Sequence, residues 1–141
     1  MIRITKIFHF ETAHAVHGYI GKCSHIHGHS YELHVCVAAR EQQDEYIAAP
    51  GFVVDFKQLK QWVQTHVVEL LDHSLVLSRD YIAAHPHLQT HTNLCVWEME
   101  PTAENILLFI RRQLQPVVPP ELQLVHLKLY ETRDSFAEWA V

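Results

Sequence analysis

Residues 23–39 have the sequence CSHIHGHSYELHVCVAA. From His27 onwards, every second residue is aromatic, aliphatic or histidine, which predicts a β-strand from about His27 to Ala39 with one face toward a core. His27 and His29 fall on the same face as the expected core residues. That face is completed by Tyr31, Leu33, Val35 and Val37. A strand here would point both imidazoles toward the interior.

An earlier strand is predicted from Ile2 to His14, because its apolar residues also alternate with polar ones. His14 continues this apolar face at a position where a core residue would normally be apolar. Three further segments follow. Asp55 is expected to cap a helix from Phe56 to Leu71, and Thr102 is expected to cap a second helix. Residues 78–100 are expected to be irregular.

Two last strands are predicted near Leu122–Thr132 and Phe136–Val141. The expected order is therefore ββααββ, an α+β pattern with a largely antiparallel sheet, formed by a single domain over residues 1–141. In the first of these strands one alternate row ends in a carboxylate, which is costly to bury unless it is paired. The row consists of Val125, Leu127, Leu129 and Glu131.

The composition favours a globular protein, because 48% of the 141 residues are hydrophobic and 19% are charged. The net charge of -5 argues against a nucleic-acid or membrane-surface partner. No apolar run reaches the roughly 18 residues that a membrane span needs. The three cysteines, Cys23, Cys36 and Cys95, are widely spaced, which favours free thiols and a cytoplasmic location.

The histidines predict a metal centre. His27 and His29 point the same way from one strand, and His14 ends the other strand on its inward face. Three imidazoles suit Zn²⁺ and leave a fourth position open, as in catalytic zinc sites. His25 shares the parity of the pair and is a rival ligand. Iron is an alternative metal, since imidazole also suits a three-histidine iron oxygenase.

Two further groups carry reactive side chains. Cys23 follows Lys22 and would lie near the cation, both of which favour a thiolate that acts as a general base. Alternatively, Cys23 completes a closed Cys-His₃ site in a non-catalytic zinc-binding module. Asp72 and His73 could form a proton relay, or simply end a helix. Glu131 could accept hydrogen bonds from a ligand's N–H groups, or reach solvent.

These segments, in this order, resemble the 6-pyruvoyltetrahydropterin synthase and 6-carboxytetrahydropterin synthase family over nearly the whole chain. The matching residues are Phe10-Glu-Thr-Ala-His14, Cys23 with His27-Gly-His29, Val54-Asp55-Phe56, Leu71-Asp72-His73, Pro101-Thr102-Ala103-Glu104-Asn105 and Glu131-Thr132.

The resemblance implies a tunnelling fold, in which subunits assemble into barrels as a homohexamer, a dimer of trimers with active sites between subunits. It implies that His14, His27 and His29 bind zinc, that Cys23 is the base, and that Asp72 and His73 form the relay. The substrate would be 7,8-dihydroneopterin triphosphate. Its pterin ring would be bound by Glu131, Thr102, Ala103 and Thr132.

Two activities of this family share that apparatus. One eliminates triphosphate to give a pyruvoyl pterin. The other also releases acetaldehyde and gives 6-carboxytetrahydropterin, a precursor of queuosine and other deazapurines. Three residues separate Cys23 from His27 here, which is similar to the queuosine-pathway group. We therefore expect the carboxy product, with the pyruvoyl synthase as the alternative.

Overall fold

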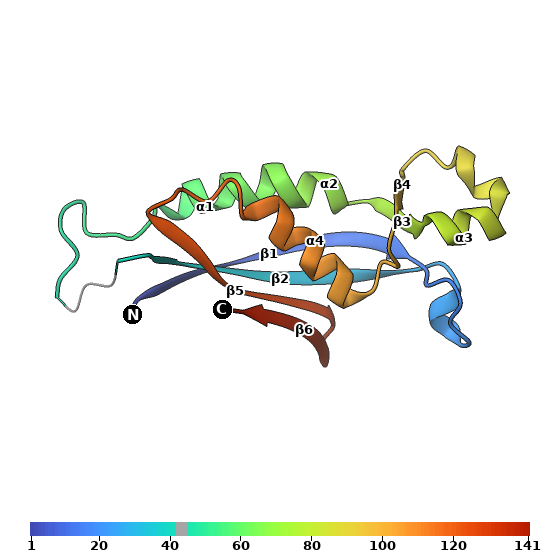
Figure 1. Ribbon diagram of the computed structural model, residues 1–141, viewed down its shortest axis with the longest axis horizontal. Helices are drawn as coiled ribbons and strands as arrows, with labels where there is room; N and C mark the ends of the chain where they lie inside the picture. Colours follow the sequence, from blue (N-terminus) through green and yellow to red (C-terminus); the bar gives the residue numbers. More distant parts are fainter. Residues whose placement is uncertain (42–44) are drawn as a thin grey trace.

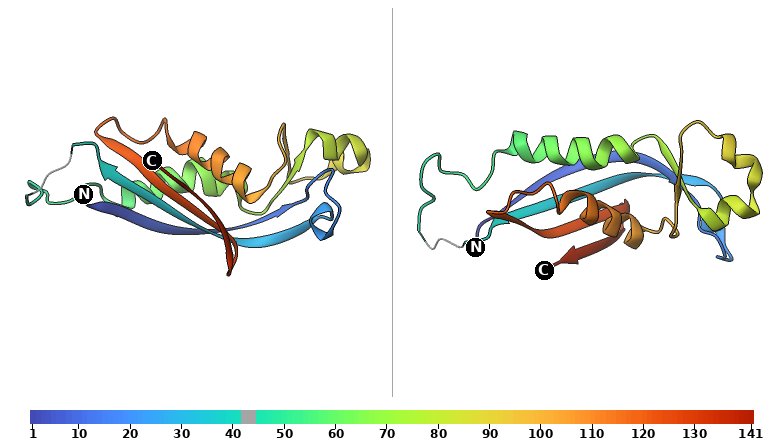
Figure 2. Two further views of the ribbon diagram at one scale, coloured as in Figure 1. Left: turned by 60° about the horizontal axis from the view of Figure 1, so that its bottom comes forward. Right: turned by 45° about the horizontal axis from the view of Figure 1, so that its top comes forward.

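The computed structural model describes residues 1–41 and 45–141. One sheet of six strands has the order β4-β3-β1-β2-β5-β6, and helices α1, α2 and α4 cover one of its faces (Figures 1 and 2). We call the face turned away from these three helices the outer face. The strands are β1 (Arg3–His14), β2 (His27–Ala39), β3 (Ser74–Ser78), β4 (Leu94–Trp97), β5 (Leu122–Thr132) and β6 (Ser135–Ala140).

The first two predicted strands are confirmed, and they form a long hairpin. β1 and β2 pair antiparallel over their whole length, from Arg3 opposite Ala38 to His14 opposite His27. Tyr31 and the three aliphatic residues of its row are at most 1% exposed, as their parity predicted. Ile2 is the exception to the prediction for β1, because it precedes the strand and is more than half exposed.

The two long helical segments are also confirmed. Asp55 accepts a hydrogen bond from Lys57 N and caps α1 (Phe56–Val63), a contact that stabilises a helix by about 1 kcal/mol. A π-helical turn at Gln64–Val68 continues α1 into α2 (Glu69–Leu71). Thr102 accepts from Asn105 N and caps α4 (Ala103–Leu114), which packs on β5 and β6.

The prediction that residues 78–100 are irregular is wrong. They end β3 and contain α3 (Arg79–Ala84), a 3-10 turn (Pro86–Thr90) and β4, which carries Cys95. β3 pairs parallel with both β1 and β4, so the sheet is mixed and the ββααββ order is interrupted by a β-α-β insertion. The Leu75–Leu77 run is buried on both faces, as is typical of parallel strands, and alternation therefore could not reveal it.

The row predicted for β5 is interrupted by a bulge. Cys36 pairs with His126 and Val37 pairs with Leu124, so that Val125 is an extra residue between them. Val125 therefore packs with Cys36 and Ala38 rather than in the main core, contrary to the prediction. Leu127 and Leu129 do face the main core, and Glu131 follows them on the same row.

Candidate metal centre

His14, His27 and His29 come together at the end of the β1–β2 hairpin. One nitrogen from each ring lies within 4.8 Å of the others, and the Nε2 atoms of His14 and His27 are 3.2 Å apart. The hairpin register produces this cluster, because it sets His14 opposite His27 while His29 returns to the same face of β2. Within the part of the chain that the structure describes, no other such group of three is found.

Backbone carbonyls fix the orientation of two of the rings. His14 Nδ1 donates to the carbonyl of Pro101 at 2.6 Å, and His27 Nδ1 donates to the carbonyl of His25 at 2.7 Å. Because a carbonyl can only accept, each Nδ1 carries the hydrogen and each Nε2 presents its lone pair to the cluster. His25, the rival ligand, contributes its carbonyl and lies outside the cluster.

Burial favours the neutral form of two of the three rings. Burial lowers the pKa of His14, and it also lowers the pKa of His29. The Nε2 atom of His29 is buried without a hydrogen-bond partner among the described residues. Imidazole nitrogen is a donor that Zn²⁺ takes, and His14 and His27 each present an Nε2 lone pair to the cluster, so these residues fit a divalent cation.

Glu131 lies against the histidines rather than reaching solvent freely. Its Oε1 is 3.6 Å from His29 Nε2 and its Oε2 is 3.9 Å from His14 Nε2, and its side chain is 26% exposed. The buried Tyr31 ring lies edge-on to both of these histidines. Burial, followed by the nearby Glu131 carboxylate, raises the pKa of Tyr31.

Cys23 lies on a short 3-10 turn, Lys22–Ser24, between the two hairpin strands, and its side chain is exposed. The turn is held on both sides. Val16 N donates to the carbonyl of Cys23 at 2.9 Å, and the Tyr81 hydroxyl donates to the carbonyl of Ser24 at 3.0 Å. Cys23 is not a member of the three-histidine cluster. A closed Cys-His₃ arrangement is therefore not formed here.

Asp72 and His73 follow α2 and are in contact. His73 Nδ1 is 3.0 Å from Asp72 Oδ1, and His73 has a positive φ of 61°. Glu11 holds both residues, since its N–H donates to Asp72 and its carbonyl accepts from His73 N. The hydrogen bond from Glu11 N, followed by the contact with His73, lowers the pKa of Asp72. Asn93 Nδ2 donates to the carbonyl of His73 at 2.7 Å.

His73 of the relay borders a hollow that Cys23 does not line. A hollow of about 380 Å³ is lined by His29, His73 and Asn93 together with outer-face residues such as Glu11 and Ser30. Cys23 is not among its lining residues. Cys23 is exposed on its turn, whereas His73 borders this hollow.

The three remaining predicted site residues lie at the edges of this region. Thr102 and Ala103 begin α4 directly after Pro101, whose carbonyl contacts His14. Thr132 is exposed at the end of β5, next to Glu131. The sequence did not reveal the roles that five other residues have at the site. These are Pro101, Tyr31, Glu11, Tyr81 and Asn93. Of these, only Tyr31 shared a parity with His29 that could have identified it.

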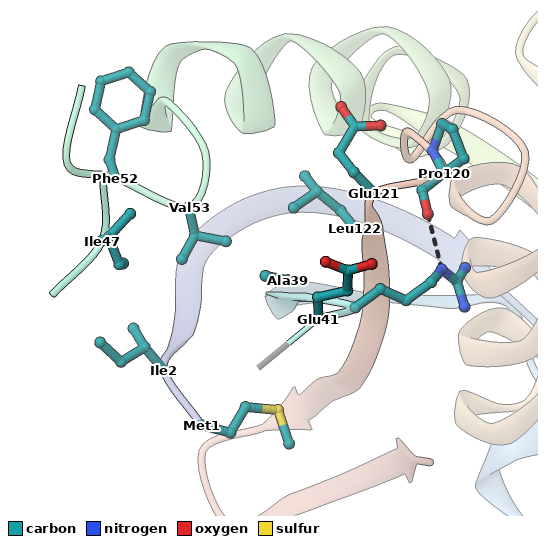
Figure 3. A pocket seen from close by; sticks show the side chains of 11 residues that line it. Met1, Ile2, Ala39, Glu41, Ile47, Phe52, Val53, Pro120, Glu121 and Leu122 are labelled. Atoms are coloured by element: carbon teal, nitrogen blue, oxygen red, sulfur yellow. Dashed lines mark hydrogen bonds between the residues drawn. The ribbon is translucent and has the colours of Figure 1, made fainter. Parts of the chain in front are cut away.

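A second hollow lies at the other end of the sheet. This cavity of about 440 Å³ has apolar walls formed by Ile2, Ile47, Phe52, Val53 and Leu122 (Figure 3). Arg40 lies at its rim and donates to the carbonyl of Pro120 at 2.8 Å. Its described lining contains no histidine or cysteine. The reactive side chains therefore gather at the end that carries the three histidines.

Known proteins share this sequence and fold. A protein named 6-carboxy-5,6,7,8-tetrahydropterin synthase from Rickettsia bellii is 33% identical, covering 98% of this chain and 99% of its own length. One of the same name from Synechocystis is 39% identical, covering 96% of this chain and 91% of its own.

A solved structure of 6-pyruvoyl tetrahydropterin synthase from Caenorhabditis elegans superposes with a TM-score of 0.70 at 20% identity, covering 99% of this chain and 95% of that one. It supports the fold alone. The family profile described as 6-pyruvoyl tetrahydropterin synthase matches residues 3–140. This chain therefore belongs to the 6-pyruvoyl tetrahydropterin synthase family.

Proposed function

We propose that this protein is a zinc-dependent carbon–carbon lyase. It would convert 7,8-dihydroneopterin 3′-triphosphate and one water molecule to 6-carboxy-5,6,7,8-tetrahydropterin, acetaldehyde and triphosphate, a step toward queuosine and other deazapurines. One observation carries this proposal: relatives with that product in their name match nearly the whole chain. The three-histidine cluster could hold the metal ion that such a reaction would use.

His14, His27 and His29 would hold the zinc ion through their Nε2 atoms. When bound, zinc acts as a Lewis acid that acidifies protons next to the oxygen atoms it polarises. The carbonyls of Pro101 and His25 keep two of the rings in the required tautomer. Burial keeps the pKa of His14 low, so that the ring is neutral and ready to bind near pH 7.

The other residues would bind the substrate and move its protons. Cys23 would remove a proton as a thiolate, and His73 would carry a proton while Asp72 orients its ring. Asp72 is suited to this task because its lowered pKa keeps it charged. Glu131 would accept hydrogen bonds from pterin N–H groups. Thr102, Ala103 and Thr132 would line the ring.

We further propose that the complete site forms between subunits of a homohexamer, a dimer of trimers. In one chain Cys23 does not line the hollow that His73 borders, and a second copy that brings a relay to each thiol would account for this. β4 and β6 are the edge strands of the described sheet and offer unpaired backbone groups to neighbouring copies. Pairing of these edge strands between neighbouring copies would join several single domains, each of residues 1–141, into one barrel.

The second candidate is a 6-pyruvoyltetrahydropterin synthase, which eliminates triphosphate without releasing acetaldehyde. It is favoured by the activity after which the family is named. A non-catalytic zinc module closed by Cys23 is less well supported, because Cys23 lies outside the histidine cluster.

Product analysis tests the proposal. Zinc-loaded protein is incubated with 7,8-dihydroneopterin triphosphate, and pterins and acetaldehyde are quantified by liquid chromatography and mass spectrometry. We expect one acetaldehyde per 6-carboxytetrahydropterin formed. A pyruvoyl pterin with no acetaldehyde would replace the proposal with the second candidate, and an unchanged substrate would reject both.

A further inference from the structure

The carboxylate of Glu131 is placed directly against the proposed metal ligands. It ends the inward row of β5 after Leu127 and Leu129, and about three quarters of its side chain is buried. Its two oxygens approach different histidines, Oε1 toward His29 Nε2 at 3.6 Å and Oε2 toward His14 Nε2 at 3.9 Å. A charged group in this position needs a partner.

Hydrogen bonding does not explain these contacts. Both distances exceed the roughly 2.7–3.2 Å range of N–H···O hydrogen bonds. In addition, the Nδ1 hydrogen of His14 is already donated to Pro101, so its Nε2 has no hydrogen to offer while the ring is neutral. The Nε2 atom of His14 and the carboxylate oxygens are therefore all acceptors, and they lie close together.

A shared cation would account for this arrangement. Two ligand atoms about 2.1 Å from one ion at a tetrahedral angle lie roughly 3.4 Å apart. The Nε2 atoms of His14 and His27 have nearly this spacing, at 3.2 Å. The two Glu131 oxygens lie 3.6 and 3.9 Å from the Nε2 atoms of His29 and His14, just outside the close group of three histidines, so a small movement of this side chain would bring one oxygen within reach of the same ion.

We propose that Glu131 is the fourth protein ligand of the bound divalent cation before substrate arrives. The inference rests on the proposed metal centre. The same carboxylate cannot hold the ion and receive the N–H groups of a pterin ring with the same oxygens. Docking of the ring would therefore withdraw Glu131 from the ion, and the fourth position would open only when a pterin is in place.

Zinc affinity tests the ligation. The zinc dissociation constants of the wild type, Glu131→Gln and Glu32→Gln are measured by competition with a chromophoric chelator. Glu32→Gln is the matched control, because it removes the same charge from β2 on the outer face. We expect Glu131→Gln to bind zinc at least about tenfold more weakly and the control to stay within about twofold. Equal affinities for all three proteins would overturn the proposal.

The cobalt form separates ligation from simple charge attraction. Replacing a ligand changes the position and intensity of the cobalt d–d bands, whereas removing a distant charge does not. We expect the bands to change in Glu131→Gln and not in Glu32→Gln. Weaker binding with unchanged bands would mean that charge alone acts, and would overturn the proposal. If Glu131→Gln does not fold, as judged by circular dichroism, Glu131→Asp is measured instead, with the same band change expected.

Unsubstituted pterin, which lacks the hydroxylated side chain, tests the withdrawal. We expect zinc loading to weaken pterin binding to the wild type severalfold, because zinc and pterin compete for Glu131. Equal pterin affinity with and without zinc would overturn the withdrawal. If pterin does not bind either form, the proposed substrate is wrong, while the zinc and cobalt measurements still decide whether Glu131 is a ligand.

Discussion

Two regularities of the β1–β2 hairpin bring His14, His27 and His29 close together. The β1–β2 register sets His14 opposite His27, and the two-residue repeat of a strand returns His29 to the same face. Burial lowers the pKa of His14 and of His29. Rings that are already neutral near pH 7 can bind a cation without first losing a proton.

Cys23→Ala is the most informative substitution at the proposed base. We expect turnover to fall at least about 100-fold, because a positioned general base contributes that much. The zinc content should not change, since Cys23 lies outside the histidine cluster. Cys95→Ala, which removes a thiol from β4, is the control and should remain active. Loss of zinc from Cys23→Ala would instead favour a closed Cys-His₃ site.

Glu32 affects how stable the fold is in acid, because it accepts hydrogen bonds from two histidines on the outer face. It accepts from His34 at 2.6 Å and from His9 at 3.2 Å, and these contacts, His34 first, hold its pKa below the usual 4.5. A carboxyl whose pKa is lower in the folded state stabilises the fold above its unfolded pKa and ceases to do so as the pH falls through the folded value.

The melting temperatures of wild type and Glu32→Gln, measured across pH, test this effect. The wild type should melt slightly higher at about pH 6, and the gap should shrink as the pH falls below about 4. The gap should be small because Glu32 is exposed. A gap that widens in acid would contradict the argument.

Parity located the three histidines and Glu131 in the sequence because strand geometry repeats every two residues. It could not locate Pro101, which reaches His14 from 87 residues away, or Glu11, which holds Asp72 and His73 through backbone groups. Contacts of this kind depend on how separate elements pack, and no local pattern in the sequence encodes them.

Among the elements, α3 supports the thiol turn from the outer face. It packs on β3 through Tyr81 and Ile82, which contact Leu75 and Leu77. The Tyr81 hydroxyl then reaches the turn that carries Cys23 and donates to the carbonyl of Ser24. α3, which follows β3 in the chain, thereby links the sheet to the turn that carries the proposed base.

Tyr81→Phe should loosen this turn without unfolding the protein. Removing one hydrogen bond costs about 1 kcal/mol, and the ring can remain packed on β3. We expect faster amide exchange at Ser24 and His25 and faster alkylation of Cys23, both followed by mass spectrometry. Tyr46→Phe, at a fully exposed ring, is the control. Unchanged exchange and alkylation in Tyr81→Phe would show that the hydroxyl does not hold the turn.

The elements that sequence reasoning found are those with clear local signals. The caps at Asp55 and Thr102 and the alternation in β1 and β2 were sufficient to predict four elements. β3 has no alternation because both of its faces are buried, and the bulge at Val125 depends on its pairing with β2. Both features arise from tertiary contacts.

On the scale of the whole molecule, β4 and β6 are the edges of the described sheet, and the hollow that His73 borders is not lined by Cys23. Both properties are consistent with the proposed assembly of several copies, in which one copy supplies Cys23 and another supplies His73. Within the described residues, no helix combines the length and hydropathy that crossing a bilayer requires.

Mixing two inactive variants tests this sharing. Cys23→Ala and His73→Ala should each be inactive alone. After subunit exchange at equal amounts, roughly one site in four should combine an intact thiol with an intact relay and regain activity. Sedimentation should show one oligomer for both variants and the mixture. Failure to regain activity in oligomers shown to be mixed would place the thiol and the relay of each site in the same chain.

The central claim is that the three histidines form the metal centre on which pterin turnover depends. The most direct test titrates metal-stripped protein with zinc while acetaldehyde release from 7,8-dihydroneopterin triphosphate is measured. We predict that turnover rises in proportion to bound zinc and saturates at about one ion per chain. His27→Ala should stay inactive, and His25→Ala should behave as the wild type. Equal turnover by metal-free and zinc-loaded protein, or by His27→Ala, would contradict the account.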